Sequence, residues 1–240
     1  MVVIFDLDGL LADTEPIWSE SEKTVLSRRG VTHDPDLKPK IMGRHPLEVA
    51  KILVCHYRLD DDPNKLMIER FSVLEQLYRK GIPPCAGAQK LVAQLADHNI
   101  LMAVASGSPQ FLIKVALKQL GLEKSIHIFV GSDEVERGKP APDIFGLAAK
   151  RLGVAPKQCI VLEDSAAGIQ AALAAGMICV AVPSPQTPKI EAQKAHLVVD
   201  SLTKLTPTIL EEVFKNVCAG KISADNATEI ARADQKAKGA

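Results

Sequence analysis

The chain has 240 residues, 47% of them hydrophobic, which is enough for one large domain or a core domain with an insertion. Lysine plus arginine equals aspartate plus glutamate at 29 each, so the formal net charge is zero and predicts no basic field for nucleic acid. The first residues carry no cationic segment followed by a long apolar run, so we expect a cytoplasmic protein without nucleic-acid or membrane partners.

Cysteine and histidine usage argues against disulfides and against a zinc site. The five cysteines are odd in number and never form a C-x-x-C pair, and the six histidines never occur as H-x-H or H-x-x-x-H. Free thiols in a reducing compartment are therefore expected.

The first predicted element is a buried strand over residues 2–5, which are apolar and rich in β-branched side chains. Asp6 and Asp8 follow it, and in an extended chain they face the same way, while Gly9 permits a sharp turn. Two carboxylates about 4 Å apart repel by about 4 kcal/mol at an effective dielectric constant of 20, so we expect a cation beside them. Hard oxygen ligands favour Mg²⁺. Alternatively, one aspartate caps the turn and the other is only solvated.

The next segment is predicted to be wholly helical. Thr14 is suited to cap a helix that runs to Arg29 and stops at Gly30, and residues 46–57 and 63–80 have helical apolar spacing. We interpret residues 14–86 as a helical cap inserted into a core that comprises 1–13 and 87–240.

From residue 87 onward, strands and helices alternate. Strands are predicted at 100–105, 126–130, 159–162 and 177–182, and helices at 88–97, 109–120, 142–152 and 166–175. This alternation predicts an α/β fold with a Rossmann-like parallel sheet covered on both faces, whose ligands bind beyond the carboxyl ends of the strands. The tail, about 206–240, is expected to form further helices, including 224–238.

Polar residues occur where those strands end. Ser106, Gly107 and Ser108 precede a helix and could bind an anion through backbone N–H groups, although such residues are often only a helix cap. Glu163 and Asp164 form a second acidic pair, which could equally be an N-cap. Lys139 lies in a loop fixed by flanking prolines, although a single loop lysine is usually solvated.

Together these groups predict a phosphate site. Asp6, Asp8, Glu163 and Asp164 would bring up to four negative charges together, and Mg²⁺ with Lys139 would offset three. We therefore infer that Asp8 carries a proton when a phosphorylated substrate binds, and that this proton serves a leaving alkoxide.

Four motifs, Phe-Asp-Leu-Asp-Gly, Ala-Ser-Gly-Ser-Pro, Gly-Lys-Pro-Ala-Pro-Asp and Leu-Glu-Asp-Ser, occur in the order found in a known family. Over about residues 1–205 the sequence resembles the haloacid dehalogenase-like hydrolases, in the β-phosphoglucomutase-like branch with a helical cap. Within this branch it looks most like sugar phosphatases acting on substrates such as 2-deoxyglucose 6-phosphate, and its opening also looks like pseudouridine-5′-phosphatases.

The resemblance implies a Mg²⁺-dependent phosphatase for a small phosphorylated metabolite. It implies that Asp6 is the nucleophile that forms an aspartyl-phosphate and that Asp8 is the general acid and then base. Mg²⁺ would lie on Asp6, the main-chain carbonyl of Asp8 and Asp164, with Glu163 close by or bound through water. The phosphoryl group would be held by Ser106, Lys139 and the backbone of Gly107 and Ser108.

Trp18 stands where the resemblance places a histidine in the mutases, ten residues after the acid/base aspartate. We therefore favour hydrolysis over a phosphosugar mutase. Carbon–halogen cleavage is not expected, because Asp8 replaces the apolar or small residue of the dehalogenases.

The loop at Gly43, Arg44 and His45 lies where relatives contact substrate. We expect Gly43 to allow close approach and Arg44, with His45, to meet sugar hydroxyls or a distal anion, although an exposed loop would also fit. Trp18 could be a sugar platform or a packing residue.

A phospho-receiver domain also combines acidic residues, a hydroxyl, a lysine and Mg²⁺ on an alternating α/β frame. Receivers are about half this length and carry the phosphorylated aspartate on a later strand, so this non-enzymatic alternative is less favoured. We expect a monomer or weak homodimer.

Overall fold

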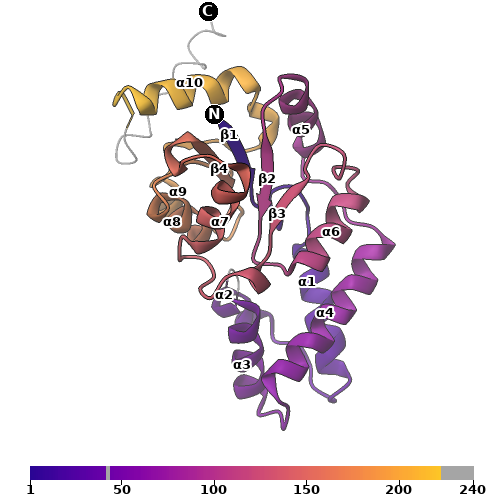
Figure 1. Ribbon diagram of the computed structural model, residues 1–240. Coiled ribbons are helices and arrows are strands. Elements are labelled where there is room, and N and C mark those ends of the chain that lie inside the picture. The colour runs from indigo at the N-terminus through magenta and orange to yellow at the C-terminus, as the bar shows by residue number, and fades with distance from the viewer. Residues whose placement is uncertain (42–43, 223–240) are drawn as a thin grey trace, which may run out of the picture.

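A six-stranded parallel sheet forms the centre of the structure, a computed structural model that describes residues 1–41 and 44–222 (Figure 1). Its strands follow the order β3-β2-β1-β4-β5-β6. The chain thus moves outward from β1 in one direction and then, from β4, in the other, which places a ligand crevice at the carboxyl ends of β1 and β4. The predicted α/β, Rossmann-like sheet is confirmed. The strands are β1 (Val2–Phe5), β2 (Met102–Ala105), β3 (Ile128–Val130), β4 (Cys159–Glu163), β5 (Ile178–Ala181) and β6 (Leu197–Val198).

Helices cover both faces of the sheet because alternate side chains of each strand point to opposite sides. On one face, Val3 and Phe5 pack with α5 (Ala88–Asp97), α6 (Gln110–Gln119) and α10 (Pro207–Cys218). On the other face, Val2 and Ile4 pack with the helices that follow β3, β4 and β5. These helices are α7 (Asp143–Leu152), α8 (Ala166–Ala174) and α9 (Lys189–Ala192). All four residues of β1 are buried, as a strand between two helical layers requires.

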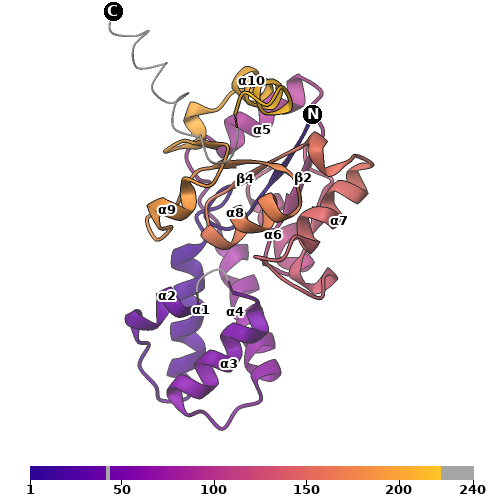
Figure 2. The ribbon, with the colours of Figure 1, turned by 90° about the vertical axis from the view of Figure 1, so that its left-hand side faces the viewer.

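Four helices extend beyond the carboxyl ends of the strands (Figure 2). They are α1 (Glu15–Ser27), α2 (Lys38–Ile41), α3 (Pro46–Tyr57) and α4 (Pro63–Lys80). Val25, Leu53 and Leu66 belong to an apolar cluster that these helices form separately from the two clusters on the sheet. We propose that residues 14–86 form the cap expected from the sequence.

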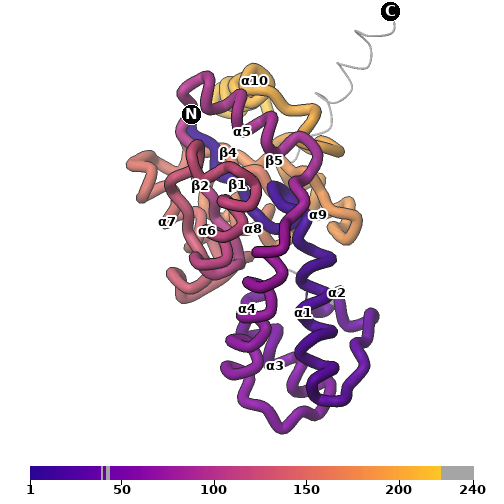
Figure 3. Tube along the Cα trace, turned by 90° about the vertical axis from the view of Figure 1, so that its right-hand side faces the viewer, coloured from indigo at the N-terminus to yellow at the C-terminus, as the bar shows by residue number. Residues whose placement is uncertain are grey.

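The two connections between this cap and the sheet run side by side (Figure 3). Asp13 N donates to Pro83 O at 2.9 Å, and Cys85 N donates to Leu11 O at 3.0 Å. The chain therefore leaves and re-enters the core through one short antiparallel contact.

Several details differ from the sequence-based expectations. Thr14 is the N-cap residue of α1, but the prediction that its side chain caps the helix is wrong, because Thr14 Oγ1 instead donates to Asp8 Oδ1 at 2.7 Å. The helix ends at Ser27, two residues before Arg29. The short strand β6 was not predicted, since two residues give no recognisable alternation. The expected helix at 224–238 lies outside the described residues.

All five cysteines are free thiols, as predicted. Within residues 1–41 and 44–222, no helix is both long enough and apolar enough to cross a bilayer.

An ion-pair network joins Arg29, just after α1, to Asp61, just before α4, and to Glu69 within α4. Arg29 donates to both carboxylate oxygens of Asp61, at 2.9 and 2.6 Å, and to Glu69 Oε2 at 2.7 Å. The hydrogen bond from Arg29 is the main cause that lowers the pKa of Asp61 and of Glu69 below their ordinary values.

We expect Arg29→Met to lower the free energy of unfolding by about 1 kcal/mol at pH 7. Because both carboxyl pKa values are lowered in the folded protein, the stabilisation is complete above their ordinary values near 4 and is lost as the pH falls through the lowered ones. Urea denaturation should therefore show a smaller difference between wild type and variant at about pH 3.

Arg79→Met provides the control, since Arg79 is an exposed residue of α4 that pairs with Glu75 one turn away. Its effect should stay within about 0.5 kcal/mol. An equal loss for Arg29→Met at both pH values would contradict the electrostatic explanation.

Candidate active site

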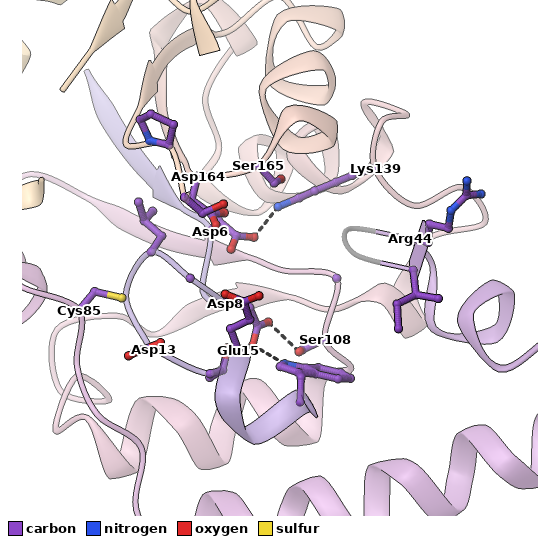
Figure 4. Close-up of a pocket in the computed structure, with 18 of the residues that line it drawn as sticks. Asp6, Asp8, Asp13, Glu15, Arg44, Cys85, Ser108, Lys139, Asp164 and Ser165 are labelled. Atoms are coloured by element: carbon purple, nitrogen blue, oxygen red, sulfur yellow. Dashed lines mark hydrogen bonds and ion pairs between the residues drawn. The ribbon is translucent and has the colours of Figure 1, made fainter. Parts of the chain in front are cut away.

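Side chains from separate segments meet at the carboxyl ends of the three central strands (Figure 4). Asp6 directly follows β1, Ser106 follows β2, and Glu163 is the last residue of β4. Lys139 reaches the same point from the loop before α7. Asp6 and Lys139 border a cavity of about 430 Å³ that the cap helices close on the other side.

Lys139 lies between two buried carboxylates. Its Nζ is 2.5 Å from Asp6 Oδ1, 2.5 Å from Glu163 Oε1 and 3.1 Å from the carbonyl oxygen of Ala105. Burial alone favours the neutral amine, but Asp6 and Glu163 outweigh it and raise the pKa of Lys139 above its ordinary value. The side chain is therefore a fixed, fully charged ammonium. It is not the solvated loop lysine that the sequence left as an alternative.

Glu163 is fully buried and is surrounded by donors. Its second oxygen, Oε2, accepts from the backbone N–H groups of Asp164 and Ser165 and from the Ser165 hydroxyl, each at 3.0 Å. Both oxygens are thus engaged within the protein, so Glu163 orients Lys139 in this structure. Gly168, in the first turn of α8, is required here because a Cβ at this position would overlap the Glu163 carboxylate.

The other two acidic groups fit a divalent cation. Asp6 and Asp164 are only 6% and 7% exposed, and Figure 4 shows their side chains close together. Burial first, and then the neighbouring carboxylates, raise the pKa of Asp6 to about 8 against the lowering effect of Lys139. Burial and Glu163 likewise raise the pKa of Asp164. A hard cation between these oxygens would relieve the cost of ionising them.

Side chains alone do not complete a metal site. In the described part of the chain, no group of three or more His, Cys, Asp or Glu is arranged to hold an ion. Two carboxylates and one main-chain carbonyl, the set implied by the resemblance, are compatible with that observation. Gly9 keeps the space free, because a Cβ there would overlap Asp164 Oδ2.

The carboxylate of Asp8 accepts five hydrogen bonds. Thr14 Oγ1, Trp18 Nε1 and Tyr78 OH donate to Oδ1 at 2.7, 3.0 and 3.0 Å, and the hydroxyls of Ser106 and Ser108 donate to Oδ2, each at 2.8 Å. Four of these partners are hydroxyls, which can also accept a hydrogen bond. The same set of partners can therefore accommodate Asp8 with or without a proton.

The serine loop is organised differently from the simple anion site expected. The Ser106 hydroxyl donates to Asp8 and accepts from the backbone N–H of Ser108 at 3.0 Å. The first backbone N–H of α6, at Gln110, donates to Asp133 Oδ1 at 2.9 Å. Of Ser106, Gly107 and Ser108, which were predicted to bind an anion, Gly107 is exposed and the two serines are buried.

The predicted cap residues also border the cavity. Arg44 is half exposed and forms an ion pair with Glu48. His45 is the N-cap residue of α3, and its Nδ1 accepts from Leu47 N at 3.3 Å. Gly43 lies outside the described residues. Trp18 was expected to be a platform or a packing residue; it packs against the apolar core, and its indole N–H also donates to Asp8.

Three contributors were missed by the sequence analysis. Tyr78 and Thr14 donate to Asp8 from the cap, and Gly168 makes room for Glu163. The role of Gly168 could have been predicted, since an isolated glycine inside an alanine-rich helix usually has a packing reason. The role of Tyr78 could not, because its position in the helical pattern is that of a core aromatic.

The family model described as haloacid dehalogenase-like hydrolase matches residues 3–182. The fructose-1-phosphate phosphatase YqaB of Escherichia coli strain K12 is 34% identical over 180 residues, covering 75% of this chain and 95% of that protein. A probable pseudouridine-5′-phosphatase of Drosophila melanogaster is 35% identical over 211 residues, covering 85% and 90%.

The fold is also found among solved structures. β-Phosphoglucomutase from Clostridium difficile superimposes with a TM-score of 0.80 at 24% identity, covering 91% of this chain and 98% of that one. The match to the family model, the identity to these relatives and the shared α/β architecture agree, and the chain belongs to the haloacid dehalogenase-like hydrolase family.

Proposed function

We propose that the protein is a Mg²⁺-dependent phosphatase that hydrolyses a small phosphorylated metabolite, in particular a sugar phosphate, through a phosphoryl group carried on Asp6. The observation that carries this proposal is the buried Asp6 at the end of β1, with Lys139 2.5 Å away, bordering a cavity that also reaches Asp8. The named activity of the E. coli relative supports the sugar-phosphate class.

In the first step, a carboxylate oxygen of Asp6 attacks the phosphorus atom, and the bond from phosphorus to the ester oxygen breaks. The departing alkoxide takes a proton from Asp8. Lys139 offsets negative charge on the transferring group, and the backbone N–H of Gly107 is a donor for it, whereas the N–H of Ser108 donates to the Ser106 hydroxyl in this structure.

In the second step, water attacks the phosphorus of the aspartyl-phosphate and gives a proton to Asp8. Inorganic phosphate leaves and the Asp6 carboxylate is restored. The hydroxyl groups around Asp8 suit this exchange, since they can follow its change of protonation.

Asp6, Asp164 and the main-chain carbonyl of Asp8 would hold Mg²⁺, which neutralises charge so that a carboxylate can approach a phosphate dianion. Glu163 supports the site indirectly, because its Oε1 holds the Lys139 ammonium in position.

The alternatives from the sequence are less well supported. A receiver domain does not account for the four cap helices, α1 to α4, that lie between β1 and β2. A phosphosugar mutase would have to use Trp18 where the mutases have histidine, and Trp18 donates to Asp8. A nucleotide phosphatase of the pseudouridine-5′-phosphate type is the second candidate, and it is favoured by the Drosophila relative.

We expect Asp6→Asn to reduce phosphate release from fructose 1-phosphate in the presence of Mg²⁺ by about 10³-fold or more, because the amide is a poor nucleophile. Acid quenching with labelled substrate should trap phosphoprotein in wild type and none in the variant. Asp97→Asn, at an exposed position ending α5, is the matched control and should retain activity. Full turnover by Asp6→Asn would refute the proposed nucleophile.

A second test uses two helical glycines. We expect Gly168→Ala to displace Glu163, and with it Lys139, and so to lower kcat/KM by about tenfold or more and the free energy of unfolding by about 1–3 kcal/mol. Gly146→Ala, in α7, meets open space and should raise stability by about 0.5–1 kcal/mol without loss of activity. The same response from both variants would show that Gly168 has no special role.

Arg44 is proposed to contact the distal part of the substrate. We expect Arg44→Ala to raise KM by no more than about fivefold, because an exposed side chain already paired with Glu48 contributes about 1 kcal/mol or less. The effect should differ between substrates, and kcat should not change. Steady-state rates over a panel of sugar phosphates and nucleotides measure it, and unchanged KM values throughout would remove Arg44 from substrate recognition.

A further inference from the structure

A buried ion pair in the cap borders the same cavity as Asp6 and Asp8. Arg70 of α4 and Glu22 of α1 are 5% and 4% exposed, and Arg70 Nη2 donates to Glu22 Oε1. Removing both charges from water is costly, and an apolar pair would pack the cap at least as well. Cap stability therefore does not explain why this ion pair is buried.

Arg70 has more donors than the protein uses. A guanidinium carries five N–H groups, yet described residues accept a hydrogen bond only from Nη2. Its Nε is enclosed without any hydrogen-bond partner. A cavity ligand cannot reach the enclosed Nε, but Arg70 borders the cavity and its remaining Nη hydrogens have no described acceptor, so these donors point to a polar ligand.

The arrangement of charges selects the kind of ligand. Each cap cation that borders the cavity is paired with a carboxylate among the described residues: Arg70 with Glu22, Lys38 with Glu15 at 2.5 Å, and Arg44 with Glu48. A second anion would meet Glu22 and Glu15 without an unpaired cation to attract it. A hydroxyl group can accept from the guanidinium and donate to a carboxylate at the same time.

Trp18 links this pair to the reaction centre. The Arg70 guanidinium lies over the indole ring at 4.7 Å from its centroid, and the indole N–H binds Asp8 at 3.0 Å. A substrate whose phosphate reaches Asp6 would therefore extend past Trp18 toward Arg70 within one cavity.

We propose that the Arg70–Glu22 pair is the cap's recognition site for substrate hydroxyl groups, so that the protein selects phosphate monoesters of polyols or sugars over unhydroxylated alkyl phosphates. This inference rests on the proposed phosphatase function and names its substrate class.

The test compares sorbitol 6-phosphate with n-hexyl phosphate, two six-carbon esters that differ in their hydroxyl groups. Wild type should have at least a tenfold higher kcat/KM for the sorbitol ester. In the double variant Glu22→Leu/Arg70→Met, which removes the pair without leaving a lone charge, this ratio should fall at least fivefold, mainly through a higher KM for the sorbitol ester. An unchanged ratio, or no preference in wild type, would overturn the proposal.

The matched control is Glu75→Leu/Arg79→Met, which removes an exposed ion pair of α4 that does not border the cavity. Its ratio should equal that of wild type. Circular dichroism checks folding, and if the buried double variant does not fold, Glu22→Gln preserves the shape and should still lower the ratio.

Calorimetric titration of the Asp6→Asn variant with each ester measures the same preference as a difference in affinity, without turnover. Absence of phosphate release from either ester by wild type would defeat the proposed function. Equal affinities of the two esters would defeat hydroxyl recognition by itself.

Discussion

The ammonium of Lys139, fixed between Asp6 and Glu163, is the interaction on which the reaction centre depends. Burial raises the pKa of Asp6, Lys139 lowers it again, and the result is still about 8, so the ammonium and a divalent cation together would be needed to keep Asp6 an ionised nucleophile. Because Asp6 follows β1 and Glu163 ends β4, the two reach the same ammonium only when these strands are neighbours in register. The backbone N–H groups that bind the other oxygen of Glu163 fix its orientation. The sheet order and the start of α8 therefore determine where Lys139 lies.

The hydrogen bonds to Asp8 make the proposed acid and base depend on two parts of the chain, the serine loop that follows β2 and the segments at α1 and α4. Ser106 and Ser108 reach one oxygen from the sheet, whereas Thr14, Trp18 and Tyr78 reach the other from the cap side. A shift of the cap relative to the sheet would exchange or lengthen the second set and leave the first unchanged. The orientation of Asp8 is in this way coupled to the position of the cap. The paired connections through residues 11–13 and 83–85 are the short segment about which such a shift would turn.

Periodicity and strand-end chemistry predicted most of the architecture. Alternating apolar runs located five of the six strands, and polar residues at strand ends identified the groups that converge on Asp6. Three-dimensional partners were not predictable in the same way. The resemblance placed Glu163 close to the metal or bound to it through water, but the sequence does not show that Lys139 and two backbone N–H groups bind its oxygens. Thr14 looked like a helix cap, since a hydroxyl before a helix has the same pattern whether it bonds its own backbone or a distant carboxylate. Local pattern identifies the residue, but tertiary packing decides its partner.

The two ends of the cavity differ in how their charges are balanced. At the sheet end, the carboxyl groups of Asp6, Asp8, Glu163 and Asp164 outnumber the single ammonium of Lys139, and burial with these neighbours raises the pKa of Asp6 and of Asp164, so a divalent cation would be needed to ionise them fully. At the cap end, each described cation that borders the cavity already has a carboxylate partner, which leaves polar groups without net charge. A molecule with a dianionic phosphate at one end and neutral hydroxyls along the rest is complementary to both ends once the metal is bound. The reverse orientation would bring the dianion against the carboxylates of Glu15 and Glu22, so charge alone directs the phosphate toward Asp6.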